Sequence, residues 1–357
     1  MNSTNTTGPL VIGREYPKDD ERSIADEMIK LLKDQMLRMY PPGTDGKIQL
    51  RQIHPKLNGC VKAEFIIEPG LPGNLKIGLF KKEKTYPAWI RFSNGKTHPI
   101  PDYKKDIRGF AIKLLNVPGE KLDHVHTDIT NFDFILMNTK NFVSEDIRKF
   151  KDILYVVTTP FSLGSLPKKI GIALRSLPIL KRAKAASINI LNPAEIPYYS
   201  TVPYRFGDET KAVKYEVRPA KSNQLLTPDK TSEDLLRVNL AATLKEHEIV
   251  YDFGIQFQTD AEKMPIEDPT VIWDSPFIKL ATIRIPKQDC DTEERRLMGE
   301  NIALNSWHCL PEHQPLGAFN RVRKYIYEEL YASRHAQNGV KDEVLQAGPD
   351  YFNDIIK

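Results

Sequence analysis

A dense series of short segments rich in β-branched and aromatic residues limits the fold of this chain more than any other pattern. Proline and glycine separate these segments, as is typical of strands joined by turns. They cover residues 47–54, 59–68, 75–80, 86–93, 111–117, 132–138, 214–220, 251–258 and 278–286. Because few helical segments lie between them, the spacing favours an antiparallel sheet or barrel over parallel strands joined by crossover helices.

Helical patterns lie before, between and after these segments. In 19–40, apolar side chains recur at three- and four-residue steps, which predicts an amphipathic helix that packs on the core. Further helices are expected over 144–157, 232–247 and 315–338. The predicted class is therefore α+β, an antiparallel barrel core with surrounding helices. We expect an N-terminal tail and packing helix in 1–45, one main domain in 46–340 and a C-terminal tail in 341–357.

Composition excludes several classes of protein. Of the 357 residues, 40% are hydrophobic and 27% are charged, as in ordinary globular proteins. The net charge of +4 is too small to indicate a nucleic-acid partner. No apolar run approaches the roughly 20 residues of a transmembrane helix, and the start of the chain does not resemble a secretory signal. Cys60, Cys290 and Cys309 form no CxxC pair, so we expect structural thiols and a cytoplasmic protein.

The segment 166–186 differs from the rest of the chain. No acidic residue lies between Asp152 and Glu195, whereas six lysines and arginines alternate with apolar side chains in this segment. A basic amphipathic helix is typical of proteins that bind a membrane surface peripherally. A helix that covers the core with its charges in water would show the same pattern, so both interpretations stay open.

Two groups of residues could suggest a metal site. His124 and His126 would point to the same side of a strand, and His308, Cys309 and His313 lie close together in the sequence. The first group lies in a polar stretch without a clear third ligand, and the second does not have the spacing of a standard zinc site. We therefore favour a solvated loop for the first group and no metal for the second.

The C-terminal helix carries a more specific arrangement. Arg323, Tyr327 and Arg334 are spaced so that all three share one helical face. A guanidinium one turn from a phenol favours the phenolate, and a phenolate is one of the few proximal ligands of haem iron. Because an arginine four residues before a tyrosine is common on basic helices, this helix alone does not indicate haem.

Five elements, taken in order, resemble the haem catalase family. The resemblance covers residues 50–340 and includes an R-x-x-H strand end, an RFS element, a D-x-RGFA-x-K element, an asparagine-bearing strand end and a proximal helix. In this chain they are Arg51 to His54, Arg91 to Ser93, residues 106–113, Asn138 in NFDFILMNTKNF, and Arg323 with Tyr327, Arg334 and Asn338.

The resemblance implies a role for each residue around haem b and its iron. His54 would be the distal histidine, its ring oriented by Ser93, and Asn138 would hold the peroxide beside it. Tyr327 would be the proximal iron ligand, with Arg323 next to it.

The same resemblance assigns further contacts to the cofactor. Arg51, Arg91 and Arg334 match positions that contact the haem propionates, a task suited to guanidinium groups because they pair bidentately with carboxylates. Phe150 lies near the position of an aromatic contact to the haem face. Residues 46–340 would then be a catalase-like haem-binding domain.

Several departures separate this chain from typical catalases. It is much shorter, and the Asp-Thr pair that usually follows the proximal tyrosine is missing. Tyr325 and Tyr331 lie close to Tyr327, so the choice of Tyr327 rests on spacing. These features resemble the short, divergent catalase-like haem proteins.

The expected function is decomposition of hydrogen peroxide by a catalase or peroxidase reaction, with a neutral His54 moving the peroxide proton. An allene oxide synthase-like enzyme acting on fatty-acid hydroperoxides is the first alternative. Those enzymes carry threonine before the distal histidine, where this chain has Ile53, which favours hydrogen peroxide. The basic segment 166–186 instead favours membrane contact and lipid substrates. A non-catalytic haem-binding protein is the second alternative, and the resemblance also implies a homo-oligomer.

Overall fold

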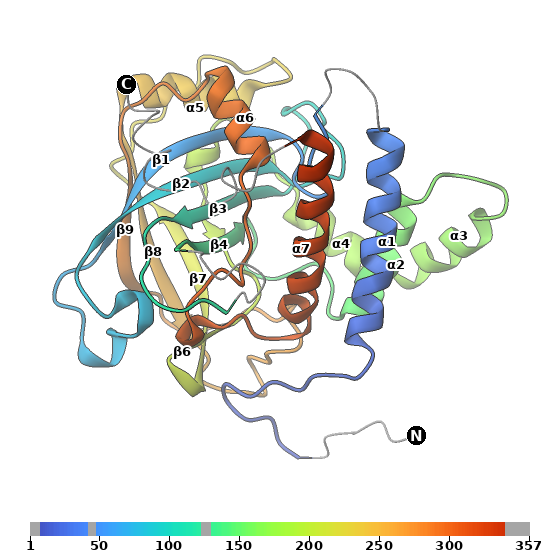
Figure 1. Cartoon of the computed structure of the whole chain (residues 1–357), viewed down its shortest axis with the longest axis horizontal. Helices are drawn as coiled ribbons and strands as arrows, with labels where there is room; N and C mark the ends of the chain where they lie inside the picture. Colours follow the sequence, from blue (N-terminus) through green and yellow to red (C-terminus); the bar gives the residue numbers. More distant parts are fainter. Residues whose placement is uncertain (1–7, 42–47, 123–129, 340–357) are drawn as a thin grey trace.

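A computed structural model describes residues 8–41, 48–122 and 130–339, and an antiparallel β-barrel forms its centre (Figure 1). Eight strands close the barrel in the order β5-β4-β3-β2-β1-β9-β8-β7, and β7 pairs back to β5. The short strand β6 pairs with β7 beyond this ring. The strands are β1 (Leu57–Ile67), β2 (Thr85–Asn94), β3 (Arg108–Leu114), β4 (Phe132–Met137), β5 (Tyr198–Tyr199), β6 (Tyr204–Phe206), β7 (Asp208–Pro219), β8 (Ile249–Phe257) and β9 (Ile278–Ile285).

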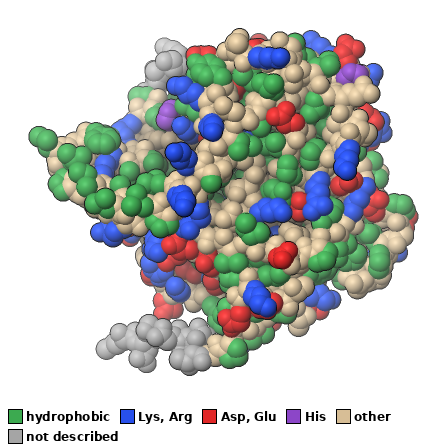
Figure 2. Space-filling model, turned by 180° about the vertical axis from the view of Figure 1, so that it is seen from behind, with side chains coloured by type: hydrophobic (Ala, Val, Ile, Leu, Met, Phe, Trp, Pro, Cys, Tyr) green, Lys and Arg blue, Asp and Glu red, His purple; other side chains and the backbone are tan. Residues whose placement is uncertain are grey.

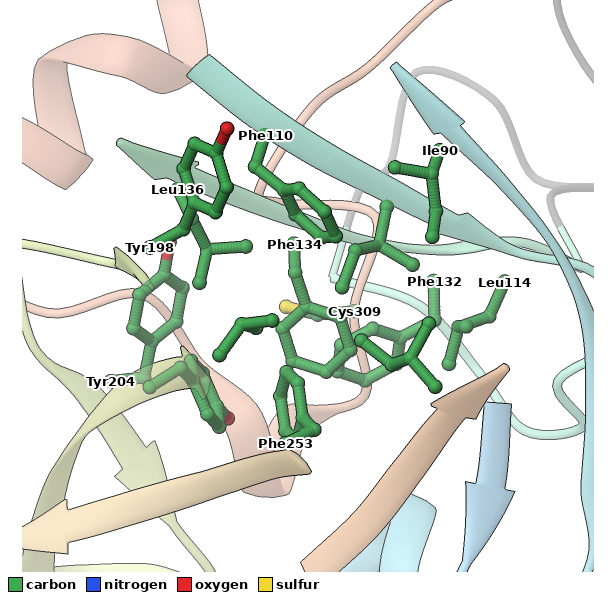
Figure 3. Close-up of a cluster of buried hydrophobic side chains, with 14 of the residues drawn as sticks. Ile90, Phe110, Leu114, Phe132, Phe134, Leu136, Tyr198, Tyr204, Phe253 and Cys309 are labelled. Carbon is green, nitrogen blue, oxygen red and sulfur yellow. The ribbon is translucent and has the colours of Figure 1, made fainter. Parts of the chain in front are cut away.

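Aromatic side chains fill the barrel interior. Figure 3 shows Phe110, Phe134 and Phe253 pointing inward from β3, β4 and β8. The ring centroids of Phe134 and Phe253 lie 4.8 Å apart, and Phe65 of β1 packs edge-on against Phe253 at 4.9 Å. Rings at these separations leave no room for a cofactor between them. The barrel is therefore a packed core, and a ligand must bind outside it.

Helices cover one side of the barrel. The long helices α1 (Glu21–Met39) and α7 (Ala318–Asn338) lie side by side, and α2 (Ile147–Thr158) packs against α1 (Figure 1). Arg321 of α7 links this helix to α1, since its guanidinium donates to the carboxylate of Glu21, and it also donates to the carboxylate of Glu267. Two further helices, α5 (Leu235–Glu246) and α6 (Glu293–Asn301), pack against β1.

The α+β barrel and the four expected helices are confirmed, but two predicted strands are wrong. No strand forms in the described residues 48–56, where the chain turns at His54 with a φ of 62° before Pro55. Residues 75–80 contribute to two 3₁₀ turns, η1 (Gly73–Leu75) and η2 (Gly78–Phe80). Gly78 has a φ of +48°, which a strand does not allow.

The segment 166–186 forms two helices, α3 (Leu166–Arg175) and α4 (Leu177–Ala186). Pro178 lies in the first turn of α4, a position where the missing N–H costs nothing and a new helix can start. Within the described parts of the chain, no helix has the length and apolar character needed to cross a membrane.

Candidate functional site

A cavity of about 360 Å³ lies between the barrel and the helices α1, α2 and α7. This volume falls within the usual range of ligand-binding pockets, and apolar side chains make up most of the wall. Eight of the nine residues predicted for the site line it: Arg51, His54, Arg91, Ser93, Phe150, Arg323, Tyr327 and Arg334. Sequence positions more than 270 residues apart thus meet at one cavity.

His54 is held in a fixed orientation at the cavity wall. Its backbone has a positive φ of 62°, a strained conformation that is often found at functional sites. The Ser93 hydroxyl lies 3.2 Å from Nδ1 of the ring, which leaves Nε2 for proton exchange. Burial, followed by the positive charges of Arg91, Arg323 and Arg51, lowers the pKa of His54 to about 3. The imidazole is therefore neutral at neutral pH.

Gly109 of β3 makes room for this ring. A Cβ at this position would lie 2.5 Å from Nδ1 of His54 and 2.6 Å from the Ser93 hydroxyl oxygen. Real Cβ atoms essentially never approach other atoms this closely. No other residue type fits here without moving the histidine.

Tyr327 comes from α7, with Arg323 one turn before it on the same face. Tyr325 does not line the cavity and instead lies under the guanidinium of Arg22, at 4.2 Å from the ring centroid. Tyr331 also lines the cavity and packs against the ring of His335 at 5.3 Å. Of the two tyrosines at the cavity, only Tyr327 has an arginine four residues before it in the sequence.

Three arginines gather at the cavity near the carboxylate of Glu300: Arg91 and Arg334 are buried and Arg51 is half-buried. Nη2 of Arg91 lies 3.7 Å from Oε2 of Glu300, and both side chains are nearly inaccessible to water. Burial and the charges of Arg334 and Arg91 lower the pKa of Arg51 well below its usual value, and burial lowers that of Arg334 to about 10. Among the described residues, Nε of Arg51 and Nε of Arg334 have no hydrogen-bond partner. Such uncompensated positive charge is costly unless an anion pairs with it.

These residues fit haem. The unpartnered guanidinium nitrogens match a ligand with two carboxylates, as the propionates supply. The wall is otherwise apolar and carries the aromatic rings of Phe142, Phe150 and Phe319, which suits a flat hydrophobic macrocycle. The Tyr327 hydroxyl, at the cavity wall, is of the chemical type that could supply an oxygen donor to the iron.

Asn138 does not join the other predicted residues. Its Oδ1 accepts from the backbone N–H of Arg108 at 2.6 Å, and its Nδ2 donates to the carbonyl of Ala186 at 2.8 Å. It is also absent from the residues that line the cavity. Because the amide joins β3 to the end of α4, the geometry does not support the predicted role of holding the peroxide.

The candidate metal residues do not converge either. Nδ1 of His308 lies 3.0 Å from a carboxylate oxygen of Asp133, and Nε2 of His313 accepts from the backbone N–H of Leu79. In the ranges that the structure covers, no three histidine, cysteine, aspartate or glutamate side chains cluster as metal ligands. His124 and His126 lie outside the described residues. All three cysteines are buried.

Sequence reasoning missed other residues of the cavity. Met28, Leu32 and Met36 of α1 form part of its wall, so the expected packing helix also shapes the site. Thr201 lines the cavity with a φ of 60°, and its buried hydroxyl has no hydrogen-bond partner among the described residues. No sequence pattern marks a strained threonine, whereas the apolar face of α1 does signal burial.

Comparisons with known proteins agree with this architecture at the level of the fold. Neither a protein-family model nor a curated protein sequence matches the chain. Among solved structures, a bacterial catalase superimposes with a TM-score of 0.63 at 16% identity, over 95% of this chain and 66% of that one. Catalase A from Saccharomyces cerevisiae gives 0.62 at 15% identity, over 96% of this chain and 72% of that one. A fungal catalase gives 0.61 at 15% identity, over 96% and 70%.

The chain thus spans about two thirds of the length of the catalases that it matches, with a closed antiparallel barrel of eight strands and little sequence identity. The protein has a catalase-like fold, in a short and divergent form.

Proposed function

We propose that the protein is a haem-dependent enzyme that consumes hydrogen peroxide. The observation that carries this proposal is that one cavity is lined by the His54–Ser93 pair, by Tyr327 with Arg323, and by Arg51, Arg91 and Arg334. The catalase-like fold supports the proposal but does not carry it, because function resides in the site.

Each group of residues has a task in binding. Arg51, Arg91 and Arg334 would pair with the two propionates, which offsets their own buried charge. Tyr327 would bind the iron as phenolate. Bound haem supplies a redox-active iron at which the O–O bond of a peroxide can be broken.

His54 would move the proton that this cleavage requires. A neutral imidazole can take the proton from one peroxide oxygen and return it to the other, which then leaves as water. The low pKa of His54, about 3, keeps the imidazole in the form that can accept a proton. Ser93 holds Nδ1 at 3.2 Å and so keeps Nε2 as the exchanging nitrogen.

Turnover of hydrogen peroxide by a His54→Ala variant tests this proposal. We expect near-complete loss of turnover with haem still bound, because Tyr327 and the arginines remain. His247→Ala, which removes a histidine outside the cavity, serves as the matched control and should keep wild-type activity. Full activity in His54→Ala would disprove the mechanism, and haem uptake without any peroxide turnover by the wild type would indicate a non-catalytic haem-binding protein.

A fatty-acid hydroperoxide is the second candidate substrate. Ile53 and Val157 both line the cavity and are 37% and 50% exposed, so apolar side chains form part of the cavity wall where it reaches the surface. Exposed apolar side chains at the cavity suit a substrate with a hydrocarbon chain. Comparison of kcat/KM for hydrogen peroxide and linoleic acid hydroperoxide distinguishes the two candidates.

A further inference from the structure

Exposed apolar side chains are concentrated in one short stretch of the chain. Across the described residues, 14 large hydrophobic side chains are exposed, and seven of them lie between 157 and 180. We call these seven residues the apolar patch. They are Val157 (50% exposed), Phe161 (80%), Leu163 (91%), Ile170 (51%), Leu174 (65%), Leu177 (59%) and Leu180 (43%). Because soluble monomers rarely expose large contiguous apolar surface, this concentration indicates a binding surface.

The helices α3 and α4 turn this patch outward. Ile172 and Ile179 are buried on the inner side, whereas Ile170 and Leu174 are one turn apart on the outer face of α3. In Figure 1, α3 lies away from the barrel, at the edge of the molecule. Figure 2 shows hydrophobic side chains gathered on the lobe that projects at the left. The two helices therefore pack one apolar face on the protein and keep their exposed charges in water, and they also expose a second apolar face.

The charge around the patch is of one sign. Lys168, Arg175, Lys181 and Lys184 are exposed in the same segment, and no acidic residue lies in 153–194. A second copy of this chain would bring the same positive charges against them and be repelled. A surface of anionic phospholipids instead pairs with the lysines and arginines and takes up the apolar side chains.

The patch continues to the entrance of the cavity. Val157 belongs to the patch and also lines the cavity. Next to it, the carbonyl of Thr158 accepts from the guanidinium of Arg38 at 2.6 Å, which places the end of α1 beside the end of α2. Met36 near that end of α1 lines the cavity too. A surface that covers the patch would therefore lie next to the cavity entrance.

We propose that the apolar patch docks the protein on an anionic membrane and places the cavity entrance at the lipid surface. Lipid hydroperoxides would then pass from the bilayer into the cavity without crossing water. The docking stands on the patch and its charges alone, whereas the lipid substrate class rests on the proposed peroxide-consuming site and on the second candidate substrate named above.

Co-sedimentation of the full chain with lipid vesicles tests the docking. We expect binding to vesicles of phosphatidylcholine with phosphatidylserine, weaker binding to phosphatidylcholine alone, and a decrease with added salt. Phe161→Ala/Leu163→Ala should lower the affinity about tenfold, because these two side chains contribute the most exposed apolar surface. Lys181→Gln/Lys184→Gln should lower it by about fivefold for each charge removed.

Matched controls separate the patch from the rest of the surface. Ile272→Ala/Leu297→Ala removes two apolar side chains that are 53% and 44% exposed elsewhere, and Lys221→Gln/Lys230→Gln removes two exposed charges elsewhere. Both should bind like the wild type, and thermal melting shows whether each variant is folded. Absence of wild-type binding, or equal losses in patch and control variants, would overturn the proposal. A wild-type dimer that Phe161→Ala/Leu163→Ala converts to a monomer would also overturn it and assign the patch to self-association.

Turnover of linoleic acid hydroperoxide in vesicles and in detergent separates this inference from the proposed function. Vesicle binding without turnover in either medium would leave the docking in place and reject lipid hydroperoxides as substrates, whereas loss of hydrogen peroxide turnover in His54→Ala tests the proposed function independently. Turnover in detergent without vesicle binding would reject the docking and leave lipid hydroperoxides as substrates. We expect both activities, and Phe161→Ala/Leu163→Ala should lose turnover in vesicles only.

Discussion

Substitution of Gly109 by alanine is the sharpest perturbation of the His54–Ser93 pair. The new Cβ would lie 2.5 Å from Nδ1 of His54, whereas ordinary contact begins near 3.4 Å, so the ring must withdraw by about 0.9 Å. The Ser93 hydroxyl must withdraw too, because the Cβ would lie 2.6 Å from its oxygen. A displacement of about 1 Å in an active site can cost about 100-fold in rate. We therefore expect kcat/KM for hydrogen peroxide to fall about 100-fold in Gly109→Ala.

Two measurements show that the loss comes from His54 and not from general damage. Overpacking costs about 1–3 kcal/mol of stability, so the variant should remain folded with a lower Tm. Its haem spectrum should stay close to that of the wild type, because Gly109 does not belong to α7, which carries Tyr327. Gly73→Ala is the matched control, since a Cβ at Gly73 meets no atom within 4 Å. Unchanged peroxide turnover in a folded, haem-bound Gly109→Ala would refute the argument that the position of His54 determines the rate.

Three further predictions follow from the buried charges. Arg51→Met should weaken haem affinity about tenfold in a haem titration, because a charged hydrogen bond is lost. The same variant should not lower the Tm of the haem-free protein, because the repulsion of Arg51 by Arg91 and Arg334 disappears. If both the haem affinity and the Tm of the haem-free protein fell, this would contradict the inference that Arg51 pairs with a propionate. Peroxide kcat/KM should be flat from about pH 5 to about pH 8, because the pKa of His54 is about 3; a decline centred at pH 6.5 would contradict it. His313 also has its pKa lowered to about 3, mainly by burial, so below pH 6.5 the unfolded chain binds more protons than the native state. His313 should therefore contribute about 2 kcal/mol to the fall in the free energy of unfolding between pH 6.5 and pH 5, and His54, with the same pKa, a similar amount. Urea titrations of His313→Gln should show about half of the wild-type fall.

Much of the barrel could be predicted from local pattern, because β-branched and aromatic runs such as 59–68 and 86–93 form strands wherever they pack. The strand predicted over 47–54 failed because the position of His54 is set by tertiary contacts, which impose a φ that no local pattern encodes. Strand β5 was missed for a similar reason, since its two residues pair only because β4 and β7 meet there.

The candidate site was predictable to the extent that it follows spacing. Arg323, Tyr327 and Arg334 share a helical face by geometry alone, and the structure places all three at the cavity. Spacing does not tell where an amide points, and the side chain of Asn138 instead bonds to two backbone groups. The close approach that requires Gly109 could not be read from sequence either, because it depends on contacts between three separate segments.

The absorption spectrum of the protein supplied with haem tests the central claim most directly, with Tyr327→Phe and Tyr331→Phe beside the wild type. Both tyrosines line the cavity, so the pair is matched in position. We predict that the wild type takes up haem with the high-spin ferric features of tyrosinate ligation, that Tyr327→Phe loses or shifts these features, and that Tyr331→Phe keeps them. A wild type that takes up no haem, or features that survive Tyr327→Phe and disappear in Tyr331→Phe, would contradict the assignment of Tyr327 as the iron ligand.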